Sequence, residues 1–192
     1  MSLPRSILFV DGENLTLRYQ AMLAAGHVPQ KGVIHASDVF VWHEKIVRNN
    51  YYDLRKVIRV CYYASIVGDE PQVVDIKRQL SQILFTTVAD DGGISGQIVP
   101  VVFKKPSKSQ KTRNVDIQIV IDIMRYAFTD EIDRVYLATG DGDYLPLIQE
   151  VMRRGKQVEL LAFSSGLNTA LPYSVDRFFD LDPVFFGVED NC

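Results

Sequence analysis

The sequence predicts an α/β fold in which helices cover both faces of a mostly parallel sheet. The main observation is that short apolar runs alternate with stretches of helical periodicity along most of the chain. A second is that runs such as ILFV and LLAF are apolar throughout, as strands buried on both faces are. The 192 residues, 47% of them hydrophobic and 23% charged, are expected to form one domain over 1–192, with its core at about 6–181 and a short C-terminal tail.

Strands are expected where apolar, β-branched or aromatic residues run together between turn residues. The expected strands are 6–10, 55–65, 97–103, 133–139 and 157–163, with a further strand-like run at 177–181. Helices are expected where apolar residues recur every three or four positions after a capping residue. The expected helices are 14–26, capped by Asn14, then 37–50, capped by Ser37, then 70–89, 115–128 and 144–155, with one more short helix in the tail.

Aspartates follow two of the expected strands at the point where each strand ends. Asp11 follows the first strand, and Asp141 and Asp143 follow the fourth in the stretch TGDGDY. An N-cap on the next helix accounts for one carboxylate, Asp143, but not for two. Open α/β sheets bind ligands beyond the carboxyl ends of their strands, where the strand order reverses. If the first and fourth strands are neighbours, these aspartates meet in one crevice, and Asp116, in the first turn of helix 115–128, faces the same place.

Carboxylates gathered so closely require a proton or a cation between them. Two unit charges about 4 Å apart repel by about 4 kcal/mol at an effective dielectric of 20. An all-oxygen donor set without His or Cys suits Mg²⁺ or Mn²⁺. The three histidines, His27, His35 and His43, lie in the segment least connected to the crevice and are interpreted as surface or packing residues.

Three blocks in order, ILFVDGENL, VDIQIVIDIM and TGDGDYLPLIQEVMRRGKQVELLAF, resemble the signature blocks of the NYN domain. The resemblance is to the LabA-like branch of the PIN-like nuclease superfamily and runs from about residue 6 to 181. It implies a three-layer α/β/α Rossmann-like fold with a five-stranded central sheet in the order 3-2-1-4-5. It also implies a metal-dependent ribonuclease activity supported by Mg²⁺ or Mn²⁺.

The resemblance carries site residues over to matching positions. The acidic catalytic and metal-binding positions fall on Asp11, Asp116, Asp141 and Asp143, and the supporting polar positions fall on Asn14, Asp122 and Thr139. For Asp122 a second interpretation, a helix-surface residue paired with Arg125 or Arg18, stays open. One departure is Arg113, which stands where the family often has lysine. Arginine binds phosphate well but is a poorer proton donor.

The stretch from 103 to 114 is basic in a chain whose net charge is −3, and it leads straight to Asp116. Its cations are Lys104, Lys105, Lys108, Lys111 and Arg113. This stretch is the predicted contact for the backbone of RNA, single-stranded in particular, and the alternative is a solvated loop. Tyr62 and Tyr63, near the end of the second strand, are interpreted either as stacking partners for unpaired bases or as core residues.

Two other functions remain open. A phosphatase of the haloacid dehalogenase type would use Asp11 as nucleophile and Glu13 as acid, and a non-catalytic RNA-binding module would keep the same pocket without turnover. Cys61 and Cys192, read as free thiols, and the lack of a signal peptide or a membrane-spanning run favour a cytoplasmic location. Phe185 and Phe186 near the C-terminal end suggest a surface for a homo-oligomer.

Overall fold

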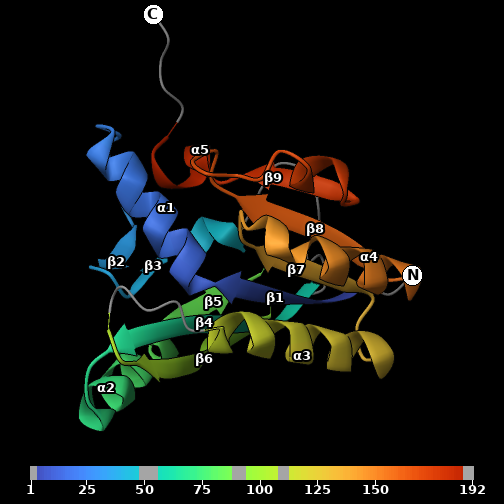
Figure 1. Cartoon of the computed structure of the whole chain (residues 1–192), viewed down its shortest axis with the longest axis horizontal. Coiled ribbons are helices and arrows are strands. Elements are labelled where there is room, and N and C mark those ends of the chain that lie inside the picture. Colours follow the sequence, from blue (N-terminus) through green and yellow to red (C-terminus); the bar gives the residue numbers. More distant parts are fainter. Residues whose placement is uncertain (1–3, 48–55, 88–93, 108–112, 188–192) are drawn as a thin grey trace, which may run out of the picture.

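The computed structural model describes residues 4–47, 56–87, 94–107 and 113–187. A seven-stranded sheet runs through its centre in the order β5-β6-β4-β1-β7-β8-β9, and β2 and β3 form a separate hairpin (Figure 1). The strands are β1 (Arg5–Asp11), β2 (Ile34–Ala36), β3 (Phe40–Trp42), β4 (Lys56–Val67), β5 (Leu84–Thr86), β6 (Ser95–Lys105), β7 (Arg134–Ala138), β8 (Gln157–Ala162) and β9 (Arg177–Asp180). The α-helices are α1 (Gly12–Ala24), α2 (Glu70–Ser81), α3 (Asn114–Phe128), α4 (Leu145–Arg153) and α5 (Asp182–Phe185), and the 3₁₀ turns are η1 (Glu44–Ile46), η2 (Gly142–Tyr144) and η3 (Leu171–Tyr173).

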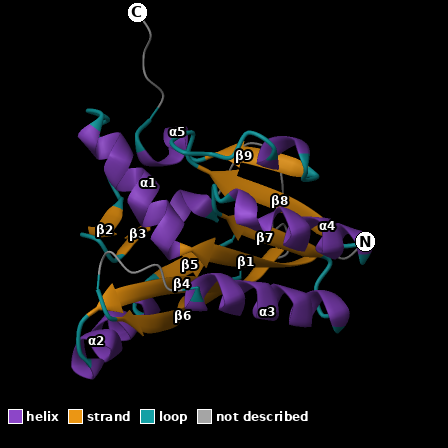
Figure 2. Ribbon diagram, viewed as in Figure 1, coloured by secondary structure: helices purple, strands orange, loops and turns teal. Residues whose placement is uncertain are grey.

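The strand order reverses on either side of β1. From β1 the chain adds β4 and then β6 on one side, and it returns to add β7, β8 and β9 on the other. All of these pairings are parallel, so the carboxyl ends share one edge, which the arrowheads mark in Figure 2. The predicted neighbours, the first strand and the strand before TGDGDY, pair directly, with Val10 opposite Ala138. This pair is the switch point at which sheets of this type bind ligands.

Alternate residues of β1 face two different cores. Ile7 and Phe9 pack with the buried faces of α3 and α4, whereas Leu8 and Val10 pack with α1, α2 and α5. A strand places successive side chains on opposite faces, so an apolar run such as ILFV satisfies both cores at once. The predicted α/β fold with helices on both faces of a mostly parallel sheet is therefore confirmed.

The predicted strand number and the predicted order 3-2-1-4-5 are wrong, because the sheet has seven strands. Two edge strands lie outside the predicted five: β9, which corresponds to the strand-like run at 177–181 and pairs in parallel with β8, and β5, which was not predicted and pairs antiparallel with β6. β5 lies inside the segment predicted as helix 70–89. Helix α2 ends at Ser81, and Phe85 then packs into the core at 2% exposure. Because this ring is buried and the segment pairs with β6, residues 84–86 form a strand although their sequence pattern favours a helix.

The segment predicted as helix 37–50 contains β3, which pairs with β2 in a hairpin, and η1, and its last three residues lie outside the described part of the chain. Phe40, Val41 and Trp42 are all buried, and such an aromatic and β-branched run suits a strand better than a helix. The Tyr62 hydroxyl donates to the Val41 carbonyl at 3.0 Å, and the Val41 N–H donates to that hydroxyl at 3.1 Å. This contact ties the hairpin to the sheet.

The C-terminal phenylalanines pack inside the molecule. Phe185 is 0% exposed, and its ring lies 4.9 Å from that of Phe163, while Phe186 stacks on Tyr19 at 5.2 Å. Phe185 is therefore not open to a partner, whereas Phe186 is half-buried beside α1, and a homo-oligomer stays a prediction. Within the described ranges, no helix has the length and apolar character needed to cross a bilayer.

Candidate active site

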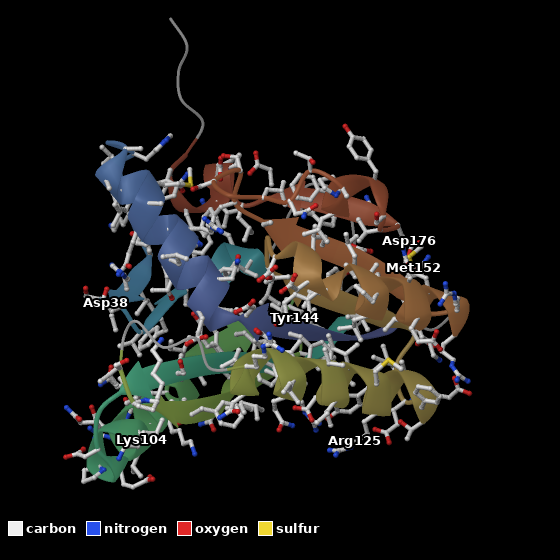
Figure 3. The ribbon with its side chains drawn as sticks, in the orientation of Figure 1. Asp38, Lys104, Arg125, Tyr144, Met152 and Asp176 are labelled. Atoms are coloured by element: carbon white, nitrogen blue, oxygen red, sulfur yellow. The ribbon has the colours of Figure 1, made fainter. Side chains whose placement is uncertain are left out.

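The candidate site lies at the carboxyl edge of the sheet, where β1 and β7 end and where α1 and α3 begin. Tyr144, at the centre of Figure 3, marks this region. Ile7 and Phe9 of β1 and Cys61 and Tyr63 of β4 face α3 and α4. By the same alternation, Asp11 at the end of β1 belongs to the α3 face. The site is therefore built on one face of one sheet edge.

Asp11 is nearly enclosed, at 3% exposure, and each of its oxygens accepts a hydrogen bond. Oδ1 accepts from the Asn14 backbone N–H at 3.0 Å, and Oδ2 accepts from the Thr139 hydroxyl at 3.0 Å. Asp11, and not the predicted Asn14, is therefore the N-cap of α1. Burial raises the pKa of Asp11 to about 7 against the opposing effect of these hydrogen bonds, and the charges of Asp116 and Glu13 raise it further.

Asn14 and Thr139, both predicted as supporting residues, fasten the two strand ends together. The Thr139 hydroxyl bonds Asp11 and accepts the backbone N–H of Asp141 at 3.2 Å. The Asn14 side-chain oxygen accepts the N–H of Gly140 at 2.9 Å, so α1 also holds the loop after β7. These contacts fix the positions of Asp11 and of the GDGD loop (residues 140–143) relative to each other.

The two aspartates of the GDGD loop have different roles, and Asp143 does not have the N-cap role that the sequence predicts. Asp141, half-buried, caps η2 by accepting the Asp143 N–H at 3.0 Å, whereas Asp143 is exposed. The N-cap assigned to Asp143 by the sequence is therefore wrong. Gly142 between them permits close packing of the loop after β8, because a Cβ at this position would lie 2.1 Å from Nδ2 of Asn168.

Asp116 reaches the site from the first turn of α3. Its Oδ1 accepts the Tyr144 hydroxyl at 3.2 Å. Burial raises the pKa of Asp116 against the effect of that hydrogen bond, and the charges of Asp141, Glu13 and Asp143 raise it further. The negative charges of Asp141 and Asp143 thus raise the pKa of Asp116, and the negative charge of Asp116 raises the pKa of Asp11. The four aspartates predicted from the sequence share one site, although their chemical roles stay predictions.

The carboxylate oxygens of this site are the atoms that would bind the divalent cation that the resemblance implies. Across residues 4–47, 56–87, 94–107 and 113–187, no three His, Cys, Asp or Glu side chains are arranged so that they could hold a metal ion. Mg²⁺ is commonly bound through only one or two carboxylates, with water and phosphate oxygens completing its shell. The all-oxygen set, with the raised pKa values of Asp11 and Asp116, fits such an open site and not a preformed cage.

The sequence analysis missed two residues of the site, Tyr144 and Ser65. It considered a third, Glu13, only as the acid of a phosphatase. Tyr144 is 2% exposed, and burial together with the carboxylates of Asp11 and Asp116 raises its pKa, so it stays a hydrogen-bond donor. Glu13 accepts hydrogen bonds from Ser65, with which it is in close contact, and from Lys105 Nζ at 2.9 Å. The signal for Tyr144 was its position directly after GDGD. Ser65 had no comparable signal.

The basic residues divide into two groups. Lys105 lies beside the acidic site through Glu13, and Arg113 is exposed at the start of α3, three residues before Asp116. Lys104 is exposed and lies at the α2 corner of the molecule, away from Tyr144 (Figure 3). Lys108 and Lys111 lie outside the described residues.

Three other candidate residues take part in packing. Tyr62 and Tyr63 are both 0% exposed, so neither can stack on a base. The Tyr63 hydroxyl donates to Asp122 at 2.9 Å, and Asp122 also accepts from Gln118 at 3.0 Å and lies 3.7 Å from Arg125. Asp122 therefore pairs with Arg125 on the side of α3. Arg18, its other suggested partner, packs against Gly166 instead.

Comparison with known proteins agrees with this architecture. A sequence model of the NYN domain, a domain of the PIN-like nuclease superfamily, matches residues 5–182. An uncharacterized protein of Methanocaldococcus jannaschii is 33% identical over 72 residues, which are 38% of this chain and 30% of that protein. The chain thus spans less than a third of that relative. A crystal structure of a protein of unknown function from Vibrio parahaemolyticus superimposes with a TM-score of 0.61 at 18% identity, over 96% of this chain and 99% of the other, which shows a shared fold.

Proposed function

Because the chain belongs to the NYN domain family, we propose that it is a divalent-metal-dependent ribonuclease that hydrolyses phosphodiester bonds of single-stranded RNA at the β1–β7 switch point. Nuclease domains of this family generally act on RNA. The observation that carries the proposal is the convergence of Asp11, Asp116, Asp141 and Asp143 at one sheet edge, with the pKa values of Asp11 and Asp116 raised. This concentration of carboxylates suits a cation.

The residues of the chain have distinct tasks in this proposal. Asp11, Asp116, Asp141 and Asp143 would hold the cation, which would supply a polarised water and neutralise charge on the phosphodiester. Thr139 and Asn14 keep Asp11 in place, and Tyr144, protonated because of its raised pKa, orients Asp116. Arg113, exposed beside Asp116, is placed to hold a phosphate bidentately.

We also propose that the chain belongs to the LabA-like branch of the family and acts in the cytoplasm. The ordered blocks around Asp11, Asp116 and Asp141 favour the LabA-like branch of the family. The free, buried thiol of Cys61 is compatible with a reducing cytoplasm. A phosphatase that uses Asp11 as a nucleophile and Glu13 as acid is less favoured, because Glu13 is already engaged by Ser65 and Lys105.

The direct test is incubation of the chain with labelled single-stranded and double-stranded RNA in Mn²⁺, with and without EDTA. We expect cleavage of the single strand in Mn²⁺ and none with EDTA. Binding without cleavage under all conditions would instead favour a non-catalytic RNA-binding module. Trapping of an aspartyl-phosphate on Asp11 would favour the phosphatase. Cleavage that persists unchanged in EDTA would contradict the metal dependence.

A further inference from the structure

A second polar cluster adjoins the acidic site on the β4–β6 side. It consists of Glu13 in the first turn of α1, Ser65 on β4 and Lys105 at the end of β6. Glu13 Oε1 accepts from the Ser65 hydroxyl and from Lys105 Nζ, which lies 2.9 Å away. The side chains of Lys105 and Glu13 are 20% and 29% exposed, and Ser65 is 2% exposed, so the ion pair is largely shielded from water.

The fold brings these three side chains together for identifiable reasons. Gly12 lets α1 start against β4, because a Cβ at this position would lie 2.2 Å from Tyr62 Cε1 and 2.5 Å from the Tyr63 carbonyl oxygen. Asp11 pairs with Tyr63, so Ser65 lies one step beyond the end of β1 on the same face. Lys105, opposite Val67, extends β6 past that point.

Lys105 and Lys104 face opposite sides of the sheet. Phe103 packs on the core beneath α3 and α4, and Val102 packs on the core beneath α1 and α2. Alternation then places Lys105 on the α3 face with Asp11 and Asp116, and Lys104 on the other face. Of these two lysines, Lys105 is the one on the face of the acidic site.

Glu13 adds a fifth carboxylate to a site that already contains four aspartates. Its charge reaches both Asp11 and Asp116. A carboxylate in such surroundings destabilises the ionised site unless it holds a cation, and Glu13 holds Lys105. The pair therefore brings an ammonium group to the edge of the acidic cluster at a fixed position.

We propose that Lys105 is a substrate-positioning residue that takes a phosphate of the RNA strand next to the acidic cluster, and that Glu13, held by Ser65, keeps its ammonium group in place. This inference rests on the proposed ribonuclease function, for which it names a residue that orients the strand. A phosphate that enters competes with Glu13 for the ammonium hydrogens, as strong charge-assisted contacts permit.

The test uses Lys105→Met, Lys105→Arg, Glu13→Gln and the Lys105→Met/Glu13→Gln pair on the full chain, with Arg153→Gln on the surface of α4 as the control. Steady-state rates at saturating single-stranded RNA give kcat, and fluorescence anisotropy gives Kd against salt. Thermal melts confirm that each variant folds. We expect Lys105→Met to lower kcat about tenfold and to flatten the log–log salt dependence of binding by about 0.7. Lys105→Arg should recover part of both losses.

Glu13→Gln separates a positioning role from a general effect of charge. Removal of one negative charge should tighten RNA binding, yet kcat should fall because the ammonium is no longer held. In the Lys105→Met background the Glu13 change should lower kcat no further, as expected for residues that act as a unit. An unchanged kcat in Glu13→Gln, or fully additive losses in the pair, would overturn the inference.

The two proposals fail in different ways. If the wild type binds RNA but does not cut it, the ribonuclease proposal fails, and the salt slope of Lys105→Met still decides whether Lys105 contacts a phosphate. A slope equal to that of the wild type overturns the inference even if RNA is cut. Absence of RNA binding by the wild type overturns both.

Discussion

At the scale of single residues, Asp11 combines features that a purely structural carboxylate rarely has. It caps α1, accepts the Thr139 hydroxyl, and remains 3% exposed with a pKa raised to about 7. Its hydrogen bonds favour the ionised form, but burial and the neighbouring carboxylates outweigh them. Perturbed pKa values of this kind are frequent at functional sites, which supports the proposal that the site takes up a cation in place of this proton.

The first prediction concerns the stability of Asp11→Asn in EDTA. The pKa of this carboxyl is about 3.8 in the unfolded chain and about 7 in the folded one, so the folded state binds more protons between these values. The wild type should therefore lose stability as pH rises from 4 to 7, by up to about 4 kcal/mol at 1.36 kcal/mol per unit. The variant should lack this loss. Urea denaturation of both proteins across that range measures it, and parallel curves would contradict the shift.

The second prediction concerns Asp141→Asn. The amide oxygen can still accept the Asp143 N–H, so the cap of η2 and the fold should survive. Loss of one negative charge should leave the melting temperature equal or higher in EDTA, while RNA cleavage falls at least about a hundredfold, as expected when a charged group of a catalytic site is removed. Asp130→Asn at the opposite edge of the sheet is the matched control. Wild-type cleavage by Asp141→Asn would exclude a required role for this carboxylate.

The residues of the site were predictable to different degrees. Asp11, Asp141 and Asp143 follow apolar strands, and a parallel sheet must bring such positions to one edge. Tyr144, although it directly follows GDGD, and Ser65 were both missed, because their contacts depend on how α1, α3 and β4 pack together in the fold. Lys105 was grouped with its neighbours in sequence, although strand alternation separates it from Lys104.

At the scale of elements, the N-terminus of α1 depends on the absence of a side chain at Gly12. A Cβ there would overlap the Tyr62 ring and the Tyr63 carbonyl oxygen. This close approach sets the direction in which α1 leaves β1, and therefore the positions of Asp11 and Glu13. The start of one helix thus connects the acidic cluster to the Ser65–Lys105 side of the site.

The third prediction is that Gly12→Ala destabilises the fold and disturbs the site together. Insertion of a methyl group into this packed contact should lower the free energy of unfolding by about 1–3 kcal/mol. Gly140→Ala is the control, because its Cβ would find neighbours no nearer than 3.5 Å. Chemical denaturation measures both variants. A loss in Gly12→Ala no larger than that in Gly140→Ala would show that α1 can move away at little cost.

The elements that the sequence misplaced share one physical cause. β5 and β3 contain residues whose local pattern is compatible with a helix, but Phe85 and Trp42 are buried in a core that also includes side chains of β1 and β4, far away in the chain. Tertiary burial overrides local propensity most easily in short edge elements. The central strands and α3 were predictable, because long apolar runs and a clear 3.6-residue period leave little choice.

At the scale of the whole molecule, the sheet gathers positive and negative groups at one edge. β1 and β7 bring the aspartates, α3 brings Asp116 and Arg113, and β6 brings Lys105. The chain is acidic overall, with a net charge of −3, so attraction of RNA depends on such local cations. We propose above all that the carboxylates at that edge bind a divalent cation.

The measurement that tests this claim most directly is anomalous diffraction from crystals of the wild type and of Asp116→Asn soaked in Mn²⁺. We expect a Mn²⁺ peak in the wild type within bonding distance of at least one oxygen of Asp11, Asp116, Asp141 or Asp143, and a weaker peak or none in the variant. Soaks at pH 8 should give higher occupancy than soaks at pH 5.5, because the raised pKa of Asp11 keeps it protonated at the lower pH. Wild-type crystals at pH 8 with no peak at this edge, or with Mn²⁺ only elsewhere, would contradict the account.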